Sequence, residues 1–551
     1  MLSQIILSED KTRLIEVRDS SITEFIVPDG VLGIESYAFC HCKSLKKIVI
    51  PNGLTAIADK AFVECNSLQS VEIPDTVSYI GNFAFSGCSL LEEISLPKSL
   101  KRIGIGIFDR CASLRKVIIP DSVTEIPVSA FKGCLSLESI VIPSDVKRIG
   151  GKAFQDCSSL RSIDIPRSVE EISYYTFDGC HSLCCVDIPP SVTKISQSAF
   201  AYCSSLTSID LPDSVIEIEE HVFFGCTSLK YIHIPKNVMQ IGEYAFADCK
   251  SMRGIHVHVD NTYFSSVDGI IFDKEQSKLI KFPSASEISE YLIPSSVTKI
   301  SPRAFDNCLN LESIVIPEQV RLLSNGIFYC CSLLKTVVLP NGPLRIKPYS
   351  FYGCSVLSNI NLHDNVRELG DYVFAGCSSL STIYISRRII TISCHAFEGC
   401  TSLKCINIPK ETSIVNDYAF DGCTSLGSIN VEQDNYSYES LDGVLYRKGK
   451  ETLVKFPEGK KTEEFYIPKS VKEIRKNAFM NCSSLKKLHI SSTVPRDLKV
   501  DSDSFVNFDF NECILSVPNG TRWEYRHHPV FGKFTYIDIS LLSGKSSGRL
   551  L

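Results

Sequence analysis

Residues 153–172 read AFQDCSSLRSIDIPRSVEEI, and this phrase returns along the chain at a fixed spacing. Phe recurs with a period of 23 residues, and 17 such Phe residues each have a Cys three positions later. Self-similarity at a fixed period is the sequence signature of a repeat architecture. The Phe residues of this series are Phe39, Phe62, Phe85, Phe108, Phe131, Phe154, Phe177, Phe200, Phe223, Phe246, Phe305, Phe328, Phe351, Phe374, Phe397, Phe420 and Phe479.

The repeat has a readable local structure. Leu-x-x-Ile-x-Ile predicts a short strand, and the Pro after it ends that strand because Pro cannot donate to a sheet ladder. Val-x-x-Ile predicts a second short extended segment, and A-F-x-x-C-x-S predicts a tight turn or a single helical turn. One unit of 23 residues cannot bury its apolar side chains alone. Stacked units are therefore expected to form a solenoid with a continuous core and little long α-helix.

These repeats resemble the BspA-type leucine-rich repeat family, which is common in bacteria. The shared phrases include AFADC (245–249), AFDGCTSL (419–426), SIDIP (162–166) and SVTKI (191–195). The resemblance covers roughly residues 22 to 540. It implies a leucine-rich repeat solenoid, a horseshoe or right-handed superhelix, with a parallel β-sheet on its concave side. For secreted members it implies adhesion or binding to host proteins.

Two segments interrupt the period, each adding 36 residues to one turn. Residues 260–283 and 434–457 match each other, and each predicts a β-hairpin that projects from the solenoid. Their D-N…D-G pattern lacks the alternating acidic residues and closing Glu of a calcium loop, so it predicts a turn. We expect these divisions: an N-terminal β-hairpin cap (1–38), a first array (39–259), an insertion (260–304), a second array (305–433), a second insertion (434–478), the last repeat with a C-terminal cap (479–540) and a flexible tail (541–551).

Seventeen of the 24 cysteines belong to the repeat. We predict that they form a column of buried free thiols, because side chains on turns about 4.8 Å apart exceed the Cβ spacing of roughly 3.8 Å that a disulfide prefers. The remaining seven form no paired C-x-x-C arrangement, so no metal site is predicted. They are Cys40, Cys184, Cys185, Cys330, Cys394, Cys405 and Cys513.

The residue between the two inward apolar positions of each strand should face solvent on the concave sheet. In successive turns this position holds three aspartates and then two histidines, with apolar residues on the preceding turns. The pattern suits a stripe that binds a basic partner segment, a cation site, or simply solvated side chains whose repulsion water screens. The candidate partner-binding residues are Asp164, Asp187, Asp210, Tyr231, His233, His256, Ile118, Val141 and Tyr384.

Composition restricts the class of function. The net charge of −6 argues against a nucleic-acid binder, and no apolar run approaches the roughly 18–20 residues that span a bilayer. No G-x-S-x-G, P-loop or H-E-x-x-H motif is present. We predict a monomeric, non-enzymatic scaffold without a cofactor that binds a protein or glycan on its concave sheet. The alternatives are a secreted adhesin for a host protein, and an enzyme with a site on that face.

The start of the chain has no basic segment followed by an apolar run of the secretory type. Together with the many thiols, this predicts a cytoplasmic protein, since free thiols persist in reducing compartments. An extracellular or cell-surface location is the alternative if the true start lies upstream.

Overall fold

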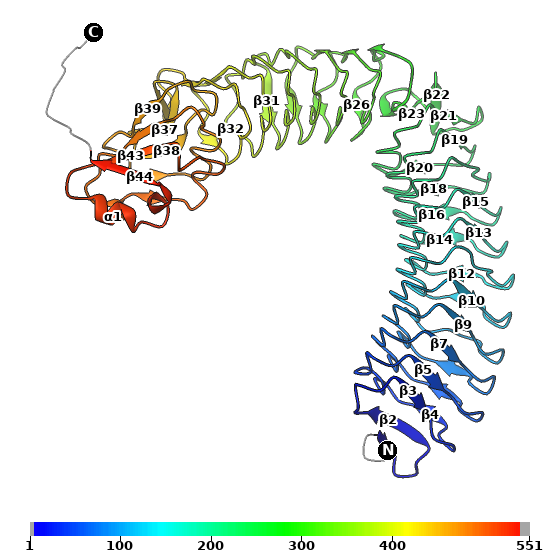
Figure 1. Ribbon diagram of the computed structural model, residues 1–551. Coiled ribbons are helices and arrows are strands. Elements are labelled where there is room, and N and C mark those ends of the chain that lie inside the picture. The colour runs from blue at the N-terminus through cyan, green and yellow to red at the C-terminus, as the bar shows by residue number, and fades with distance from the viewer. Residues whose placement is uncertain (1–4, 540–551) are drawn as a thin grey trace, which may run out of the picture. The chain divides into compact units, whose positions relative to one another are not determined.

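The computed structural model describes residues 5–539, so the predicted tail at 541–551 lies outside the described residues. The chain divides into two compact units, residues 1–286 and 287–551. The division falls inside the segment 260–304 that the sequence predicts as the first insertion. Each unit is a stack of turns of the chain, as the ribbons of Figure 1 show.

A repeat forms one turn, and most repeats contain two short strands. Residues 162–164 form β13 and residues 171–172 form β14 in the repeat that begins at Phe154. The Phe-containing stretch between turns is a series of tight turns without helix. We call the Leu-x-x-Ile-x-Ile strand of a repeat its first strand and the Val-x-x-Ile strand its second strand.

In the first unit, first strands pair in parallel with a register of one repeat, as Ser162 with Cys185 shows. Second strands pair in the same way on another side of the turn, as Glu171 with Lys194 shows. The first strands are β3 (Glu24–Ile26), β5 (Lys47–Val49), β7 (Ser70–Glu72), β9 (Glu93–Ser95), β10 (Lys116–Ile118), β13 (Ser162–Asp164), β15 (Cys185–Asp187), β17 (Ser208–Ile209), β19 (Tyr231–Ile234) and β21 (Gly254–Val257). The second strands are β4 (Gly33–Ile34), β6 (Ala56–Ile57), β8 (Tyr79–Ile80), β11 (Glu125–Ile126), β12 (Arg148–Ile149), β14 (Glu171–Ile172), β16 (Lys194–Ile195), β18 (Glu217–Ile218) and β20 (Gln240–Ile241).

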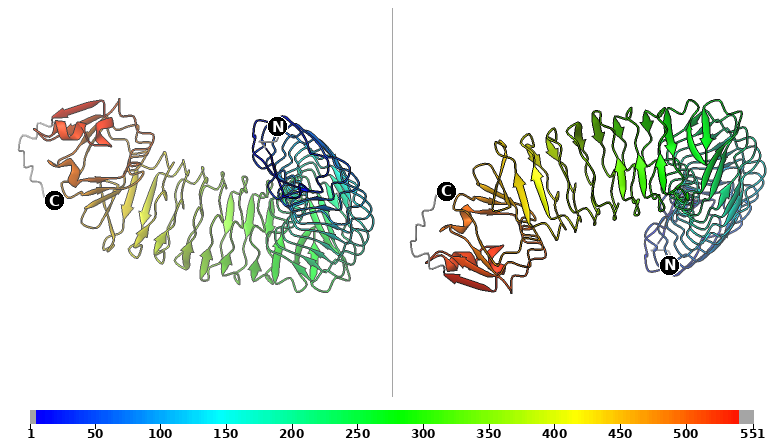
Figure 2. Two further views of the ribbon diagram at one scale, coloured as in Figure 1. Left: turned by 90° about the horizontal axis from the view of Figure 1, so that it is seen from below. Right: turned by 90° about the horizontal axis from the view of Figure 1, so that it is seen from above.

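The second unit repeats this plan. Its first strands are β25 (Glu290–Leu292), β27 (Ser313–Val315), β29 (Thr336–Val338), β33 (Cys405–Ile408), β35 (Ser428–Val431), β39 (Glu464–Tyr466) and β41 (Lys487–His489). Its second strands are β26 (Lys299–Ile300), β28 (Leu322–Leu323), β30 (Leu344–Ile346), β31 (Val366–Leu369), β32 (Thr391–Ile392), β34 (Ile414–Val415), β40 (Glu473–Ile474) and β42 (Lys499–Val500). In Figure 2 the strands of successive turns of this unit run side by side.

The core consists of columns of identical side chains. The Phe rings of the repeat are buried and stack on one another within each unit, with centroid separations such as 5.2 Å between Phe62 and Phe85. Beside them lies the cysteine column, in which most thiols donate to a carbonyl of the preceding turn. The Sγ of Cys157, for example, lies 3.1 Å from the Phe131 carbonyl oxygen. A thiol fits this position because it is small, largely apolar and a weak donor.

The two insertions are built into the solenoid, in contrast to the expected projecting hairpins. Each forms three antiparallel strands with buried apolar side chains, among them Phe272 and Tyr446. In the second insertion the last strand also pairs in parallel with β40, the second strand of the following repeat. The strands are β22 (Phe264–Val267), β23 (Ile270–Asp273) and β24 (Lys278–Lys281) in one insertion, and β36 (Tyr438–Leu441), β37 (Val444–Arg447) and β38 (Thr452–Lys455) in the other.

The D-G pairs of the insertions form two-residue hairpin loops. Asp268 and Gly269 have φ angles of 51° and 76°, and Asp442 and Gly443 have 50° and 75°. Two successive left-handed residues are the signature of the type I′ turn, which matches the twist of a hairpin. The expectation of a turn at this pattern therefore holds.

Other elements close the described ends of the stack. β1 (Ile5–Leu7) and β2 (Arg13–Val17) form an antiparallel hairpin, and β2 pairs with β4. At the other end β43 (Ile514–Val517) pairs with β41 and with β44 (Tyr536–Ile539). The only helical elements within residues 5–539 are α1 (Arg522–Arg526), η2 (Pro495–Asp497) and η3 (Phe531–Lys533), and none is long enough to cross a membrane.

The predicted fold class is confirmed: the protein is a solenoid of parallel strands, with short strands, turns and almost no helix. Figure 2 also shows the first unit end-on, where the outlines of successive turns superpose. The assignment of the first strands to a concave side stays a prediction.

Candidate binding surface

The first strands of the first unit expose two side chains each. Along a strand the side chains alternate between faces, so the central residue is buried and its two neighbours face solvent. In β13 these are buried Ile163 between exposed Ser162 and Asp164. We call the exposed surface over β5, β7, β9, β10, residues 139–141, β13, β15, β17, β19 and β21 the first-strand face. Eight of the nine candidate residues lie on it.

The three aspartates occupy successive turns of the first-strand face, and we call them the acidic column. Asp164 of β13 and Asp187 of β15 are directly opposed in the register, and Asp210 follows β17 on the next turn. All three are exposed, and none takes part in an ion pair within residues 5–539. Neighbouring carboxylates repel by about 1 kcal/mol at this spacing in water. The acidic column is therefore a line of uncompensated charge on a solvated surface.

The aromatic candidates lie on the two turns after the acidic column. His233 of β19 pairs with His256 of β21, and their ring centroids are 5.4 Å apart. Tyr231 lies 6.0 Å from the ring of His256 and is 45% exposed. The three rings form a small exposed aromatic surface with hydrogen-bonding edges, which suits contact with a protein or a sugar.

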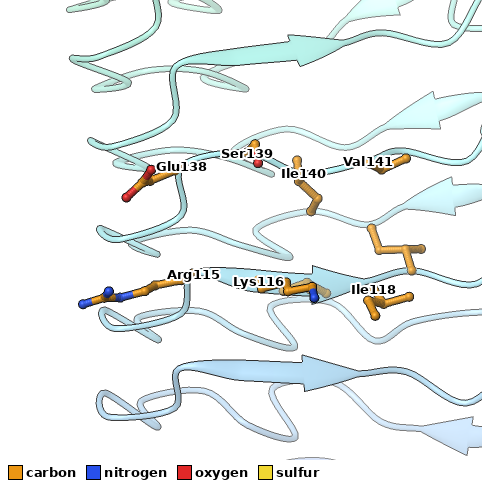
Figure 3. Close-up of a pocket in the computed structure, with 9 residues that line it drawn as sticks. Arg115, Lys116, Ile118, Glu138, Ser139, Ile140 and Val141 are labelled. Atoms are coloured by element: carbon orange, nitrogen blue, oxygen red, sulfur yellow. The ribbon is translucent and has the colours of Figure 1, made fainter.

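The apolar candidates line a hollow on the turns before the acidic column. Ile118 is 50% exposed and Val141 is 82% exposed, and Figure 3 shows them on two successive turns that line the hollow. The hollow has a volume of about 580 Å³. It is lined by Arg115, Lys116, Val117, Ile118, Ile119, Glu138, Ser139, Ile140 and Val141.

Tyr384, the ninth candidate, lies in the second unit and outside any strand. Its hydroxyl donates to Asp364 Oδ1 at 2.6 Å, and this hydrogen bond raises the pKa of Tyr384. The structure therefore gives this tyrosine a local partner in the second unit.

The cysteines differ sharply in exposure. All 24 are free thiols, as predicted for the cysteine column, and burial raises the pKa of column members, of Cys400 to about 12. Cys184 and Cys185 are exposed on the first-strand face, with their Sγ atoms 3.8 Å apart. Within residues 5–539, no three His, Cys, Asp or Glu side chains come together in a way that could hold a metal ion.

Sequence reasoning missed a stack of aromatic rings in the second unit. Tyr349, Tyr372, His395 and Tyr418 lie on successive turns, with centroid separations of 4.9, 4.3 and 4.7 Å. All four have φ between 55° and 63°. This stack is predictable from the sequence, because each of its four residues stands two positions before a Phe of the repeat.

A family comparison agrees with this geometry. The model of the BspA type leucine rich repeat region matches residues 17–138, 124–253, 280–387, 323–441 and 455–522. The chain belongs to the BspA-type leucine-rich repeat family. Among curated proteins, none matches the chain.

Several solved structures are similar to this BspA-type protein. A leucine rich cell surface protein from Faecalibacterium prausnitzii is 26% identical, covering 78% of this chain and 92% of its own, with a TM-score of 0.41. A leucine-rich repeat protein from Bacteroides ovatus is 22% identical, covering 78% and 91%, with a TM-score of 0.42. The T. pallidum leucine rich repeat protein is 31% identical, covering 37% and 87%, with a TM-score of 0.30.

Proposed function

We propose that this protein is a non-enzymatic recognition scaffold whose first-strand face binds a macromolecular partner, a protein or a glycan. It acts as a monomer, needs no cofactor, and neither binds nucleic acid nor inserts into a membrane. BspA-type repeats are generally binding scaffolds, which supports this class of function. The identity of the partner is the subject of the experiments below.

One observation carries the proposal: the buried residues of the first-strand face are of constant type, whereas its exposed residues vary. Across ten turns, from Ile48 to Ile255, the buried central residue is always Ile or Val. The exposed residue that follows it takes six different types, from Val49 to His256. Ten turns at about 4.8 Å make a surface on the order of 45 Å long. Such a surface matches an extended macromolecular ligand better than a small molecule.

Unbiased selection tests this function. The full chain is immobilised and presented with a random peptide library displayed on phage and, separately, with a glycan array. Ligands recovered on the native protein are then measured on Asp187→Lys, and on Glu170→Lys as the matched control. Glu170 is also exposed but lies outside the first-strand face. We expect ligands that weaken at least fivefold on Asp187→Lys and are unchanged on Glu170→Lys. Ligands that bind both variants equally well contradict the proposal.

We further propose that the protein resides in the cytoplasm. The support is chemical: 24 free thiols, two of them exposed and adjacent, suit a reducing compartment. A surface adhesin is the alternative. A membrane-impermeant maleimide applied to intact cells separates the two, because it labels Cys184 and Cys185 only if the first-strand face is outside.

An enzyme on the first-strand face is the remaining alternative. Asp187 and His233 are the residues it would use. Any activity found with the native protein that disappears in Asp187→Asn or His233→Ala, while ligand binding persists, would favour the enzyme over the scaffold.

A further inference from the structure

The ladder of first strands in the first unit is interrupted around residues 139–141 and again between β15 and β17. β10 pairs with β9, but residues 139–141 of the next turn form no strand. Within residues 5–539, no backbone hydrogen bond of the ladder joins Lys116–Ile118 to residues 139–141. The peptide groups on these two facing edges therefore have no ladder partner on the neighbouring turn.

The opening is confined to the first-strand face. On the second-strand side, β11 and β12 of the same two turns are paired in register. In the core, the rings of Phe108 and Phe131 stack at 5.7 Å, and the Cys134 thiol donates to the Phe108 carbonyl at 3.3 Å. The two turns are thus joined on the second-strand side and in the core. They lack a ladder on the first-strand face, at Ile118 and Val141. This produces the hollow of about 580 Å³ seen in Figure 3.

The charges around the hollow are asymmetric along the solenoid. Arg115 and Lys116 line it on the turn of β10. In the other direction, Asp164, Asp187 and Asp210 follow Val141 on the next three turns, all at the ends of their strands. Arg161 precedes the start of β13 and Arg167 follows Asp164 by three residues, and neither forms an ion pair with Asp164 within residues 5–539. A ligand seated in the hollow therefore meets three successive aspartates in one direction, and in the other it meets Arg115 and Lys116 first and then Glu93 and Glu72.

We infer that the ligand of this face is an extended segment of a partner protein with one apolar side chain between Ile118 and Val141 and basic side chains over the acidic column. This inference rests on the proposed function and names its partner. Apolar side chains bury the exposed Ile and Val, and Lys or Arg supplies the missing counter-charge. Lys116 and Arg115 fix the direction, because they repel basic residues on the other side of the hollow.

The spacing defines the segment. From Val141 to Asp210 is three turns, about 14 Å. An extended chain rises about 3.3 Å per residue and places every second side chain on one face. Basic residues two and four positions after the apolar anchor then lie about 7 and 13 Å along, over the acidic column. The segment is therefore apolar-x-basic-x-basic.

Fluorescence anisotropy with the full chain and defined labelled peptides tests this inference. The probe is Gly-Leu-Ser-Lys-Ser-Lys-Gly. Three control peptides replace its Leu by Ser, replace both Lys by Glu, or move both Lys to the other side of the Leu. We expect the probe to bind at least tenfold more tightly than each control peptide, and more weakly as salt rises, because exposed charges are screened.

Protein variants locate the two halves of the site. Val141→Ser should weaken the probe at least fivefold by removing the apolar contact, and Asp187→Asn should weaken it at least threefold and reduce the salt dependence. Glu170→Gln, the matched control, should leave binding unchanged. Both test positions are exposed, and equal melting temperatures will show that the variants are folded.

Two results overturn the inference. One is equal affinity for the probe and its Glu version, and the other is a probe whose binding ignores both Val141→Ser and Asp187→Asn. The unbiased selection separates this from the proposed function. Selected ligands that require the first-strand face but lack the apolar-x-basic-x-basic pattern refute the inference and leave the proposed function standing. Selected ligands that ignore the face refute the proposed function itself.

Discussion

Two buried asparagines show how much one residue can do in this fold. Asn435 donates through Nδ2 to the carbonyls of Pro409 at 2.8 Å and Thr412 at 2.9 Å, and its Oδ1 accepts from the amides of Ser437 and Tyr438, both at 2.8 Å. Asn261 makes the equivalent four bonds in the other insertion. Each asparagine joins the start of an insertion to the turn before it.

Replacing Asn435 by Ala should therefore destabilise the second unit by about 3 kcal/mol, since several buried backbone groups lose their partner at once. The free energy of unfolding is measured in urea by the fluorescence of Trp523, the only Trp of the chain, which lies in that unit. Asn430→Ala is the control. Asn430 is exposed and its amide bonds only Asn407 Oδ1, at 3.1 Å, so a change within about 0.5 kcal/mol is expected. Equal effects of the two substitutions would contradict this role for Asn435.

The thiols should react in an order set by their surroundings. A thiolate is the reactive form, and burial raises the pKa of column thiols such as Cys157 far above the working pH. Cys184 and Cys185 are exposed. Brief treatment of the native protein with iodoacetamide at pH 8 should alkylate this pair and spare the column, as read by peptide mapping in a mass spectrometer. In urea all 24 should react. Early alkylation of the column would contradict the predicted protection.

At the scale of elements, the second insertion contains a buried charge network. Lys455, the last residue of β38, places Nζ 2.7 Å from Asp421 Oδ1 and 3.2 Å from Glu458 Oε1. Asn477 donates to the other oxygen of Asp421, and Asn481 donates to Glu458 Oε2 at 2.9 Å. The network joins the insertion to the repeats on both sides of it. Burial lowers the pKa of Lys455, but the two carboxylates outweigh burial and raise it overall.

Lys455→Met should destabilise the second unit by about 3–5 kcal/mol, because it leaves two carboxylates buried without their cation. The triple variant with Asp421→Asn and Glu458→Gln should recover most of this loss, because it also removes the buried negative charges. Urea unfolding at pH 7 measures both. Lys472→Met is the matched control, since its ion pair with Glu451 is exposed on both sides.

The same network implies a direction of pH dependence. The pKa of Lys455 is raised in the folded state, so its contribution to stability is complete below the pKa of an unfolded Lys. The contribution disappears as pH rises through the folded value. On the alkaline side of pH 7, the stability gap between the native protein and Lys455→Met should therefore narrow only in strongly alkaline solution. A gap that narrows between pH 7 and pH 9 as pH rises would contradict this assignment.

These structural features are easier to predict from the sequence the more often their residues recur in it. The Phe and Cys columns recur 17 times, so their burial and stacking follow from the period alone. The hydrogen bonds of Asn435 occur in two copies. The carbonyl groups that accept from Asn435 lie 23 and 26 residues upstream, and the residue types at those positions do not reveal the contact. The two carboxylates around Lys455 belong to one insertion only: the first insertion has Ala247 and Ser284 where the second has Asp421 and Glu458.

The candidate surface was predictable in its residues but not in its shape. The exposed position after each central Ile or Val follows from strand alternation, and this places Asp164, Asp187 and Asp210 in one line. The opening between β10 and residues 139–141 does not follow, because that repeat, from Phe131 to Ile149, keeps the Phe, Cys, Leu, Ile, Pro and Val of its neighbours and differs at Asp145, where they have Ser. A ladder is lost when stacked turns shift slightly relative to one another. The spacing of residues in a repeat does not encode such small shifts.

At the scale of the whole molecule, each turn is bonded only to the turns before and after it. Strand β7, for example, pairs with β5 and β9 and with no other strand. Stability in such a stack is approximately a sum of the turns and their nearest-neighbour interfaces. A whole turn is therefore a removable unit, whereas part of a turn is not.

Deleting residues 154–176 should leave a folded solenoid, because Ala153 then precedes Phe177 and every column stays in register. Deleting only residues 154–165 removes one Phe, one Cys and a first strand while keeping a second strand, and should unfold the neighbouring turns. Far-UV circular dichroism and urea unfolding compare the two. A whole-turn deletion as damaging as the partial one would contradict nearest-neighbour stability.

Nearest-neighbour bonding also determines how the protein responds to mechanical tension. A pull on the two ends reaches every interface between turns in series, so the weakest turn yields first and the others remain closed. Each released turn of 23 residues extends to about 80 Å and gives up about 5 Å of stacked height, a gain of roughly 75 Å. The chain therefore lengthens under tension in nearly equal steps. A partner bound across several turns would lose its contacts one turn at a time.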